Sequence, residues 1–154
     1  MKIYLGSDHG GFKLKENFKQ YLLVNHADFQ IEDCGAFAFE PADDYPFFAF
    51  QVAEKVSSNS DQALGILLCR SGSGMVIAAN KVKDVRAVEL YDEKIAAHSK
   101  SHNHANVIAF SGDYLNLPRM IELFEIFLKT ASDESERHVR RVMQITNYEE
   151  NREI

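Results

Sequence analysis

Short apolar runs alternate along the chain with longer segments in which apolar residues recur every three or four positions. Residues 2–7 (KIYLGS) and 63–69 (ALGILLC) are apolar runs of strand length, and a Gly-containing loop follows each. Residues 12–24 carry their large apolar side chains at mixed three- and four-residue spacing, which is typical of a helix with one buried face. The whole pattern predicts strands at 2–7, 29–34, 63–69, 85–90 and 106–110, and helices at 12–24, 46–56, 75–80, 92–102, 117–129 and 133–146.

This alternation predicts a doubly wound parallel α/β sheet. The run at 63–69 is apolar at almost every position, as expected for a strand that helices cover on both faces. Each right-handed connection between parallel strands places a helix on one face or the other. We expect five parallel strands in the order 2-1-3-4-5. The length of 154 residues predicts one domain over residues 1–154, in which residues 147–154 form a polar tail.

The composition excludes several classes of protein. Hydrophobic residues make up 45% and charged residues 26%, as in globular proteins, and no run of about 18 apolar residues occurs, so we expect neither a signal peptide nor a membrane span. The formal charge of −6 argues against a general attraction to nucleic acid or membrane, so an anionic ligand requires a local basic cluster. Two cysteines without metal-ligand spacing favour a reducing cytoplasm and no metal site. We therefore expect a cytoplasmic protein with no nucleic-acid or membrane partner.

Two polar loops follow the first and third predicted strands. In open α/β sheets, ligands bind at the carboxyl ends of the strands, where the strand order reverses. For the expected order this point lies between the first and third strands. The loops there are residues 7–11 (SDHGG) and 69–74 (CRSGSG), and we expect them to form the binding site.

The first of these loops places an acid and an imidazole side by side. Asp8 and His9 could perform acid–base chemistry, and Gly10 and Gly11 let the backbone approach a ligand. Alternatively, Asp8 caps the following helix and His9 is merely exposed. The loop alone favours neither interpretation.

The second loop combines a cysteine with a run of small residues. It lacks the lysine of a P-loop, but its backbone N–H groups open a helix and suit an anion or oxyanion. Cys69 ends the strand, where those N–H groups and the helix dipole favour a thiolate that could act as a base. The alternative is that Cys69 is a small core residue. Ser71 either donates to an oxyanion or solvates the turn.

Arginines gather near the end of the sequence. Arg137 and Arg141 are four residues apart and share one face of the predicted helix, where two guanidinium groups can bind a phosphate. Asp133 and Glu136 lie four residues before Arg137 and Arg140, so a solvated, salt-bridged face is the competing interpretation.

Two further features have alternative readings. His102 and Asn103 close the predicted helix at 92–102, where a histidine either joins a site or complements the negative end of the helix. The second feature is a concentration of aromatic residues, which most simply fills the core, although an excess near a loop covers a partner subunit. Its members are Phe37, Phe39, Phe47, Phe48 and Phe50.

In their order and spacing, these motifs resemble a known family. The segments are SDHGG at 7–11, DYP at 44–46, CRSGSGM at 69–75, AANKV at 78–82, RA at 86–87, HN at 102–103, NV at 106–107 and RHVRR at 137–141. Together they resemble the type B ribose-5-phosphate isomerases and the galactose-6-phosphate isomerase subunits, from residue 1 to about residue 146. The resemblance implies a Rossmann-like three-layer sandwich and a homodimer or dimer of dimers with shared active sites. It also implies metal-free aldose–ketose isomerisation through an enediolate, without an organic cofactor.

The resemblance also implies roles for individual residues. Cys69 would move the proton between C1 and C2, and His102 would assist opening of the sugar ring. The enediolate oxygen would be stabilised by Ser71 and the backbone of Gly72, Ser73 and Gly74. The sugar hydroxyls would meet Asp8, Asp44 and Asn103, with Tyr45 also at the substrate, and the phosphate would meet His9, Arg137 and Arg141.

Among the departures from the family pattern, two change the charge near the expected phosphate. The family commonly has glycine where this chain has Arg70, and an arginine that reaches the neighbouring subunit's phosphate where this chain has Asp113. An acid there would repel a phosphate dianion. Our hypothesis is that Arg70 restores the positive charge at the substrate, or that the substrate differs from ribose 5-phosphate.

The sequence therefore predicts an aldose–ketose isomerase, an intramolecular oxidoreductase that converts ribose 5-phosphate to ribulose 5-phosphate in the pentose phosphate pathway. Two alternatives stay open. The first is an isomerase of another phosphorylated sugar, galactose 6-phosphate or allose 6-phosphate. The second is a non-catalytic module that binds sugar phosphates.

Overall fold

Five parallel strands form one sheet in the computed structural model, which describes residues 1–59 and 62–151. The strands are β1 (Lys2–Ser7), β2 (Gln30–Asp33), β3 (Ala63–Cys69), β4 (Ala87–Glu89) and β5 (Val107–Ser111). Their order in the sheet is β2-β1-β3-β5-β4, and every neighbouring pair is parallel. The predicted parallel α/β sheet is confirmed.

Six helices accompany the sheet in the described part of the chain. They are α1 (Phe12–Asn25), α2 (Tyr45–Ser57), α3 (Ser73–Ala79), α4 (Glu93–Ser101), α5 (Leu117–Lys129) and α6 (Glu136–Asn151). Every predicted element is present, with bounds that differ from the expected ones by a few residues. Among residues 1–59 and 62–151, no helix combines the length and the apolar character needed to cross a membrane.

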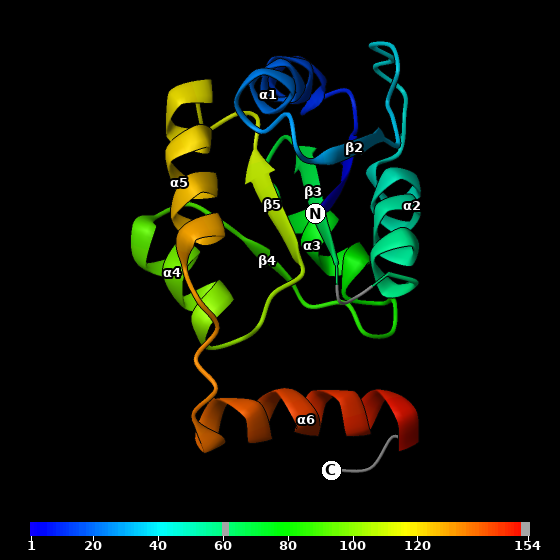
Figure 1. Ribbon diagram of the computed structural model, residues 1–154. Coiled ribbons are helices and arrows are strands. Elements are labelled where there is room, and N and C mark those ends of the chain that lie inside the picture. Colours follow the sequence, from blue (N-terminus) through cyan, green and yellow to red (C-terminus); the bar gives the residue numbers. More distant parts are fainter. Residues whose placement is uncertain (60–61, 152–154) are drawn as a thin grey trace.

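Helices cover both faces of the sheet (Figure 1). On one face, Leu5 of β1 belongs to an apolar cluster with Phe18 of α1 and Phe124 of α5. On the other face, Leu67 of β3 belongs to a cluster with Val52 of α2. Because successive residues of a strand face opposite sides, strands that are apolar at every position can feed both clusters. The expected three-layer sandwich is therefore confirmed.

The predicted strand order 2-1-3-4-5 is wrong at one edge of the sheet, where β5 and not β4 lies beside β3. β5 is buried over its whole length, so it needs a neighbour on each side. β4 has only three residues, of which Val88 and Glu89 are half-buried, and this suits an edge strand. The reversal between β1 and β3 is unaffected. However, the loop after β5 now lies next to the loop after β3.

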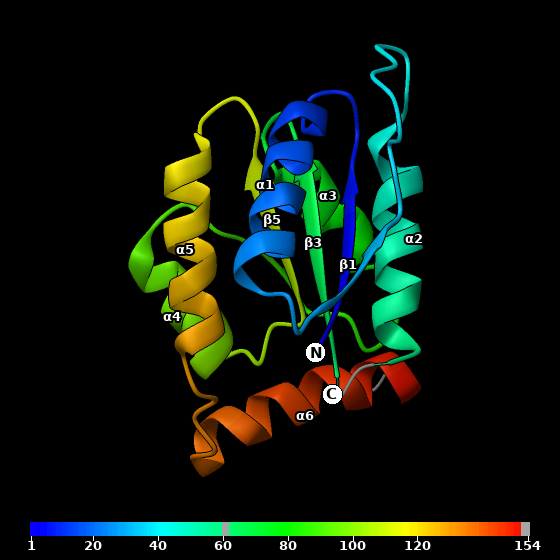
Figure 2. The same cartoon turned by 45° about the horizontal axis from the view of Figure 1, so that its top comes forward.

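Helix α6 lies across one end of the molecule instead of on a face of the sheet (Figures 1 and 2). It was expected to end near residue 146 but continues to Asn151, so the expected polar tail begins as helix. Residues 152–154 of that tail lie outside the described residues. Near its C-terminal end, α6 contacts the loop before β4, where the Asp84 N–H donates to Glu149 at 2.9 Å.

The aromatic residues between positions 37 and 50 lie largely on the surface. Phe37, Phe39, Phe47 and Phe50 are exposed, and only Phe48 packs against the core. The expectation that these residues fill the core is wrong. Phe37 and Phe39 lie in the segment between β2 and α2, much of which projects beyond the sheet (Figure 1), and Phe47 and Phe50 lie on α2 with their side chains exposed. Exposed aromatic side chains in such a group are typical of an interaction surface.

A fully buried lysine links α1 to the segment that follows β2. Lys15 Nζ donates to Asp33 Oδ1 and to the Ala36 carbonyl, both at 2.7 Å, and Lys19 binds the second Asp33 oxygen. Burial acts to raise the pKa of Asp33, but the hydrogen bonds from both lysines and from the Gly35 N–H outweigh it and hold this pKa below its usual value. The pair therefore fixes the start of the exposed segment to α1.

We expect Lys15→Met to lower the free energy of unfolding by about 3 kcal/mol at pH 7, because it removes a buried charge partner from Asp33 and leaves the Ala36 carbonyl without its lysine donor. A lowered pKa of Asp33 adds stability above the unfolded-state value of about 3.9, and this stability is lost as the pH falls through the folded-state pKa. The difference from wild type should therefore narrow below about pH 4. Urea unfolding at pH 7 and pH 3 measures both effects.

Lys13→Met is the matched control, because Lys13 lies exposed on the same helix and should change stability by less than about 0.5 kcal/mol. A Lys15→Met protein as stable as this control at pH 7 would contradict the role of the buried pair.

Candidate active site

The loops after β1 and β3 pack against each other at the carboxyl edge of the sheet, as predicted. The Asp8 N–H donates to the Leu68 carbonyl at 3.2 Å. A Cβ atom on Gly11 would lie 2.5 Å from the Leu68 backbone, and one on Gly10 would lie 2.9 Å from the Arg70 backbone nitrogen. Glycine is therefore required at both positions, because the two backbones approach too closely for a side chain.

Cys69 ends β3 at the base of the second loop. It packs in the apolar cluster that contacts α2 and α3, and it is only 4% exposed. The Gly72 N–H donates to its sulfur at 3.1 Å, through a turn in which Gly72 has a φ of 86°. Cys69 thus packs as a core residue, and its sulfur also accepts a hydrogen bond from the loop that we expected to stabilise an anion. Ser71 is exposed beside it.

The loop after β5 joins these loops through three hydrogen bonds. The Gly112 N–H donates to the Cys69 carbonyl at 2.8 Å, and Ser111 Oγ and the Asp113 N–H donate to the Arg70 carbonyl at 2.6 and 3.0 Å. The Arg70 and Asp113 side chains form an ion pair, with Nε and Oδ2 3.0 Å apart. The acid at position 113 therefore neutralises Arg70 and does not stand free beside the loops.

Hydrogen bonds hold both titratable residues of the first loop. Asp8 Oδ1 accepts the Gly11 N–H at 3.0 Å, so Asp8 stabilises the turn into α1. Burial raises the pKa of Asp8, and the Gly11 N–H offsets this only in part. Asp43 Oδ1 lies 2.6 Å from His9 Nδ1 and accepts the His9 backbone N–H at 3.0 Å. The hydrogen bond that the imidazole donates to Asp43 raises the pKa of His9 against the opposing effect of burial.

The DYP segment contributes Tyr45 to the packing of the loops. A Cβ atom on Gly74 would lie 2.9 Å from the Tyr45 ring, so this ring lies against the start of α3. Asp44 is exposed just before α2, and its side chain does not hydrogen-bond the first N–H groups of that helix. The acid that contacts the first loop is its neighbour, Asp43.

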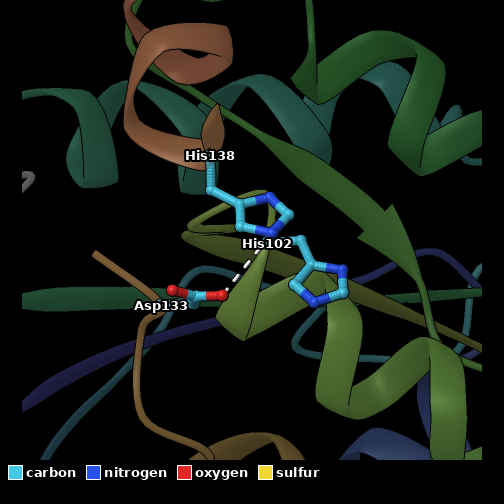
Figure 3. A group of neighbouring side chains, drawn as sticks. All are labelled: His102, Asp133 and His138. Atoms are coloured by element: carbon cyan, nitrogen blue, oxygen red, sulfur yellow. Dashed lines mark ion pairs between the residues drawn. The ribbon is translucent and has the colours of Figure 1, made fainter. Parts of the chain in front are cut away.

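His102 lies in a stack of imidazole rings at the C-terminal end of α4 (Figure 3). Its ring stacks on His98 and His138, with centroids 4.4 and 4.2 Å away. Asp133 Oδ2 lies 3.5 Å from His138 Nε2, and Arg137 Nε donates to the same nitrogen at 3.1 Å. Burial lowers the pKa of His138, and the charges of His102 and Arg137 lower it further.

The side chains of His102, Asp133 and His138 bring possible metal ligands within 4.8 Å of one another. A cation bound there would face the Arg137 guanidinium group, so these surroundings suit an anion better.

Arg137 and Arg141 are exposed on α6. The salt-bridged alternative required two ion pairs, and only one of them forms, between Glu136 and Arg140 at 3.1 Å. Asp133 pairs with His138 and not with Arg137. Within the residues that the structure describes, neither Arg137 nor Arg141 forms an ion pair with a carboxylate, so both are available to an anionic ligand.

The predicted site residues form two groups at opposite ends of the sheet. Cys69 pairs with Ser111 at the carboxyl end of β5, whereas His102 and Asn103 precede Val107 at its amino end. At about 3.3 Å per residue, the length of β5 alone separates the two ends by roughly 13 Å. Asn103 lines a pocket of about 350 Å³ that α6 also lines. One chain thus brings together the loops that bear His9 and Cys69 but holds His102, Asn103 and the arginines apart from them.

Three residues of these groups escaped the sequence analysis. Asp43 stands next to the DYP segment and His138 stands inside RHVRR, so the neighbouring motifs were the available signal. Glu89 accepts a hydrogen bond from Ser73 Oγ at 2.8 Å. No motif marks Glu89, because its contact depends on how β4 and α3 pack together.

Known proteins are similar to this chain over nearly its whole length. The model of the Ribose/Galactose Isomerase family matches residues 3–145. A probable ribose-5-phosphate isomerase B from Mycoplasma genitalium is 42% identical over 151 residues, which cover 98% of this chain and 97% of that protein. Ribose-5-phosphate isomerase B from Mycolicibacterium paratuberculosis is 36% identical over 149 residues, which cover 97% of this chain and 92% of that protein.

Solved structures match over the same length. The Mycoplasma genitalium ribose-5-phosphate isomerase B, solved with bound ribulose-5-phosphate, gives a TM-score of 0.90 at 41% identity and covers 97% of each chain. The type B ribose 5-phosphate isomerase of Trypanosoma cruzi gives a TM-score of 0.90 at 37% identity, covering 97% of this chain and 99% of that one. With both sequence and fold matching over nearly its whole length, this chain belongs to the ribose/galactose isomerase family, with the type B ribose-5-phosphate isomerases among its relatives.

Proposed function

We propose that this protein is an aldose–ketose isomerase that interconverts ribose 5-phosphate and ribulose 5-phosphate. The observation that carries the proposal is the match, over 97% of both chains, to a relative whose structure holds ribulose-5-phosphate. The geometry adds support, because the loops that bear His9 and Cys69 meet at the edge of the sheet where α/β proteins bind their ligands.

The reaction moves one proton between adjacent carbons of the open-chain sugar. A base removes the proton from C2 of the aldose, and the electron pair of that bond forms the enediolate. The C2 hydroxyl proton passes to the C1 oxygen, and the carbon-bound proton is returned to C1 as the ketose forms. In this proposal the Cys69 sulfur is the base. Ser71 and the N–H groups of residues 72–74 stabilise the charge that develops on oxygen. The Gly72 N–H, which donates to the sulfur, holds the base and this loop in one arrangement.

In this proposal the other site residues bind the substrate, and their charge and position suggest which part each one contacts. His9 and the guanidinium groups of Arg137 and Arg141 bind the phosphate, since charge-assisted hydrogen bonds are the strongest available contacts to it. His102 assists ring opening, and Asn103 beside it binds a hydroxyl. The other substrate-binding residues in this proposal are Asp8, Asp44, Tyr45 and Arg70.

We place each site between two copies of the chain, because one copy holds the two groups of residues at opposite ends of the sheet. Helix α6 carries both phosphate-binding arginines and exposes large apolar side chains, which suits burial against a second copy. These side chains are Met143, Ile145 and Tyr148. In a homodimer or dimer of dimers, the α6 end of one copy meets the loop edge of the other and completes equivalent sites.

One observation favours testing a second class of substrate beside ribose 5-phosphate. The position expected to hold a phosphate-binding arginine is Asp113, and this acid neutralises Arg70. A changed charge near the phosphate makes phosphorylated hexoses, such as galactose 6-phosphate and allose 6-phosphate, the natural comparison.

We expect the purified protein to convert ribose 5-phosphate with a higher kcat/KM than either hexose phosphate. Ribose without phosphate should react at least roughly 10²-fold less well, because it loses charge-assisted hydrogen bonds of about 1.5–3 kcal/mol each. NMR in D2O measures both turnover and exchange at the reacting carbon. Tight binding of these sugar phosphates with no turnover of any would contradict the proposal and favour the non-catalytic module.

Cys69→Ala should lower kcat by about 10²–10⁴-fold and leave KM within about threefold, because proton transfer stabilises only the transition state. Cys34→Ala is the matched control and should keep full activity: Cys34 is buried in the same apolar cluster, and burial raises its pKa to about 11. Steady-state kinetics compare the two variants. Equal losses in both would attribute the effect to packing and remove Cys69 from the mechanism.

Mixing two inactive variants tests the shared site. A dimer of one Cys69→Ala chain and one His102→Ala chain has one doubly altered site and one intact site. Random pairing of equal amounts makes half of the dimers mixed, so about a quarter of wild-type activity should return. Activity after co-expression measures this recovery. A co-expressed mixture as inactive as its parents would contradict a site built from two chains.

A further inference from the structure

No step of the proposed isomerisation uses the contact between His9 and Asp43. Asp43 belongs to the segment before α2, 34 residues away along the chain. Its Oδ1 atom accepts the His9 backbone N–H at 3.0 Å and lies 2.6 Å from His9 Nδ1. Because a carboxylate only accepts, Nδ1 carries the proton. Two hydrogen bonds to one atom fix both the position and the orientation of the imidazole ring.

With Nδ1 engaged, Nε2 is the ring nitrogen available to a ligand. In the described part of the chain, no protein group hydrogen-bonds His9 Nε2. Phe39 packs edge-on to the ring, with centroids 6.2 Å apart, and 27% of the His9 side chain is exposed. The ring is therefore held by protein at one nitrogen and open at the other.

The surroundings of Asp43 favour a cation beside it. Its side chain is only 10% exposed, and its second oxygen, Oδ2, is buried with no hydrogen-bond partner among the described residues. A buried carboxylate with a free oxygen is destabilising unless a positive group neutralises it. The group in contact with Asp43 is the His9 ring, so the pair stabilises the protonated imidazole.

Charged groups from three segments face His9, and most of them raise its pKa. The hydrogen bond that the ring donates to Asp43 raises the pKa of His9 most, and the charge of Asp8 on its own loop raises it further. Burial and the guanidinium of Arg70, from the loop after β3, act to lower it. Because the net effect is a rise, His9 stays protonated to a higher pH than an ordinary histidine, whose pKa is about 6.5.

We propose that Asp43 is a positioning residue that holds His9 with Nδ1 turned inward, so that the protonated ring directs its Nε2–H at the phosphate of the substrate. This inference rests on the proposed function, which places the phosphate at His9. Asp43 itself does not touch the substrate and acts only through the ring. The strength of phosphate binding is thus set by an ion pair between the first loop and the segment before α2.

Asp43→Asn keeps the shape and an acceptor oxygen but removes the charge. We expect KM for ribose 5-phosphate to rise while kcat changes little. The ratio of the variant's KM to the wild-type KM should be near 1 at about pH 5.5, where the ring is protonated in both proteins. It should grow as the pH passes about 6.5, by up to roughly tenfold for each unit that the pKa of His9 falls. The substrate phosphate titrates near pH 6 in both assays, so the ratio cancels its effect.

Two further variants separate charge from structure. Glu40→Gln removes an exposed acid from the same segment, one whose carboxylate contacts the Ala42 N–H and not His9, so its KM ratio should stay flat across the pH range. Asp43→Glu restores the negative charge and should return the pH profile toward that of wild type. Loss of activity in Asp43→Glu with the same pH profile as Asp43→Asn would overturn the proposal.

NMR of the ligand-free protein measures the pair without any substrate. The His9 ring signal, assigned by its loss in His9→Gln, should titrate at a lower pH in Asp43→Asn and at the wild-type pH in Glu40→Gln. An unchanged titration in Asp43→Asn would overturn the proposal, and so would a lowered titration with a flat KM ratio.

If ribose 5-phosphate proves not to be a substrate, the proposed function fails, but the role of Asp43 can still be tested. Binding of inorganic phosphate to Asp43→Asn, expected to weaken above about pH 6.5, then replaces the KM ratio.

Discussion

The parallel pairing of β1 with β3 is the interaction on which the rest of the site depends. The two strands run in register from Lys2 with Ala63 to Ser7 with Leu68, so they end at the same level of the sheet. Their loops must then pack against each other, and the contacts at Gly10 and Gly11 leave no room for a side chain. A substitution that separated these backbones would move the imidazole loop away from the cysteine loop, even though it changed neither functional residue.

The same parallel arrangement also limits what one chain can do. All carboxyl ends of the strands lie at one edge, and the connection from α4 to β5 lies at the other. Cys69 at the end of β3 and His102 at the end of α4 therefore lie at opposite edges of the sheet in one copy. Helix α6 lies across the amino-end edge and carries exposed arginines and apolar side chains, which is compatible with the proposed site between two copies.

Apolar periodicity was sufficient to predict the element types, the parallel sheet and the meeting of the first and third loops, because these depend on local sequence and on simple rules of chain connection. It could not order β4 and β5, since the choice depends on which strand is better buried on both faces, a property of the assembled sheet. Because the strand order was predicted wrongly, the contact of residues 111–113 with Arg70 was not expected. For the same reason Asp43 was missed in favour of Asp44, because two adjacent acids look alike until the backbone directs one of them toward His9.

The ion pair between Arg70 and Asp113 shows how the two departures from the family pattern can be compatible with an anionic substrate. Taken singly, the acid repels a phosphate and the arginine adds bulk beside the cysteine. Together their charges cancel, and both side chains are well exposed, with 69% and 40% accessible. Exposed ion pairs contribute little to stability, so the guanidinium can leave the carboxylate for a stronger anion without loss of the fold. A phosphate dianion offers more charge and more acceptor oxygens than a single carboxylate. If Arg70 contacts the substrate, as we propose, its exchange of Asp113 for the phosphate would therefore cost the fold little.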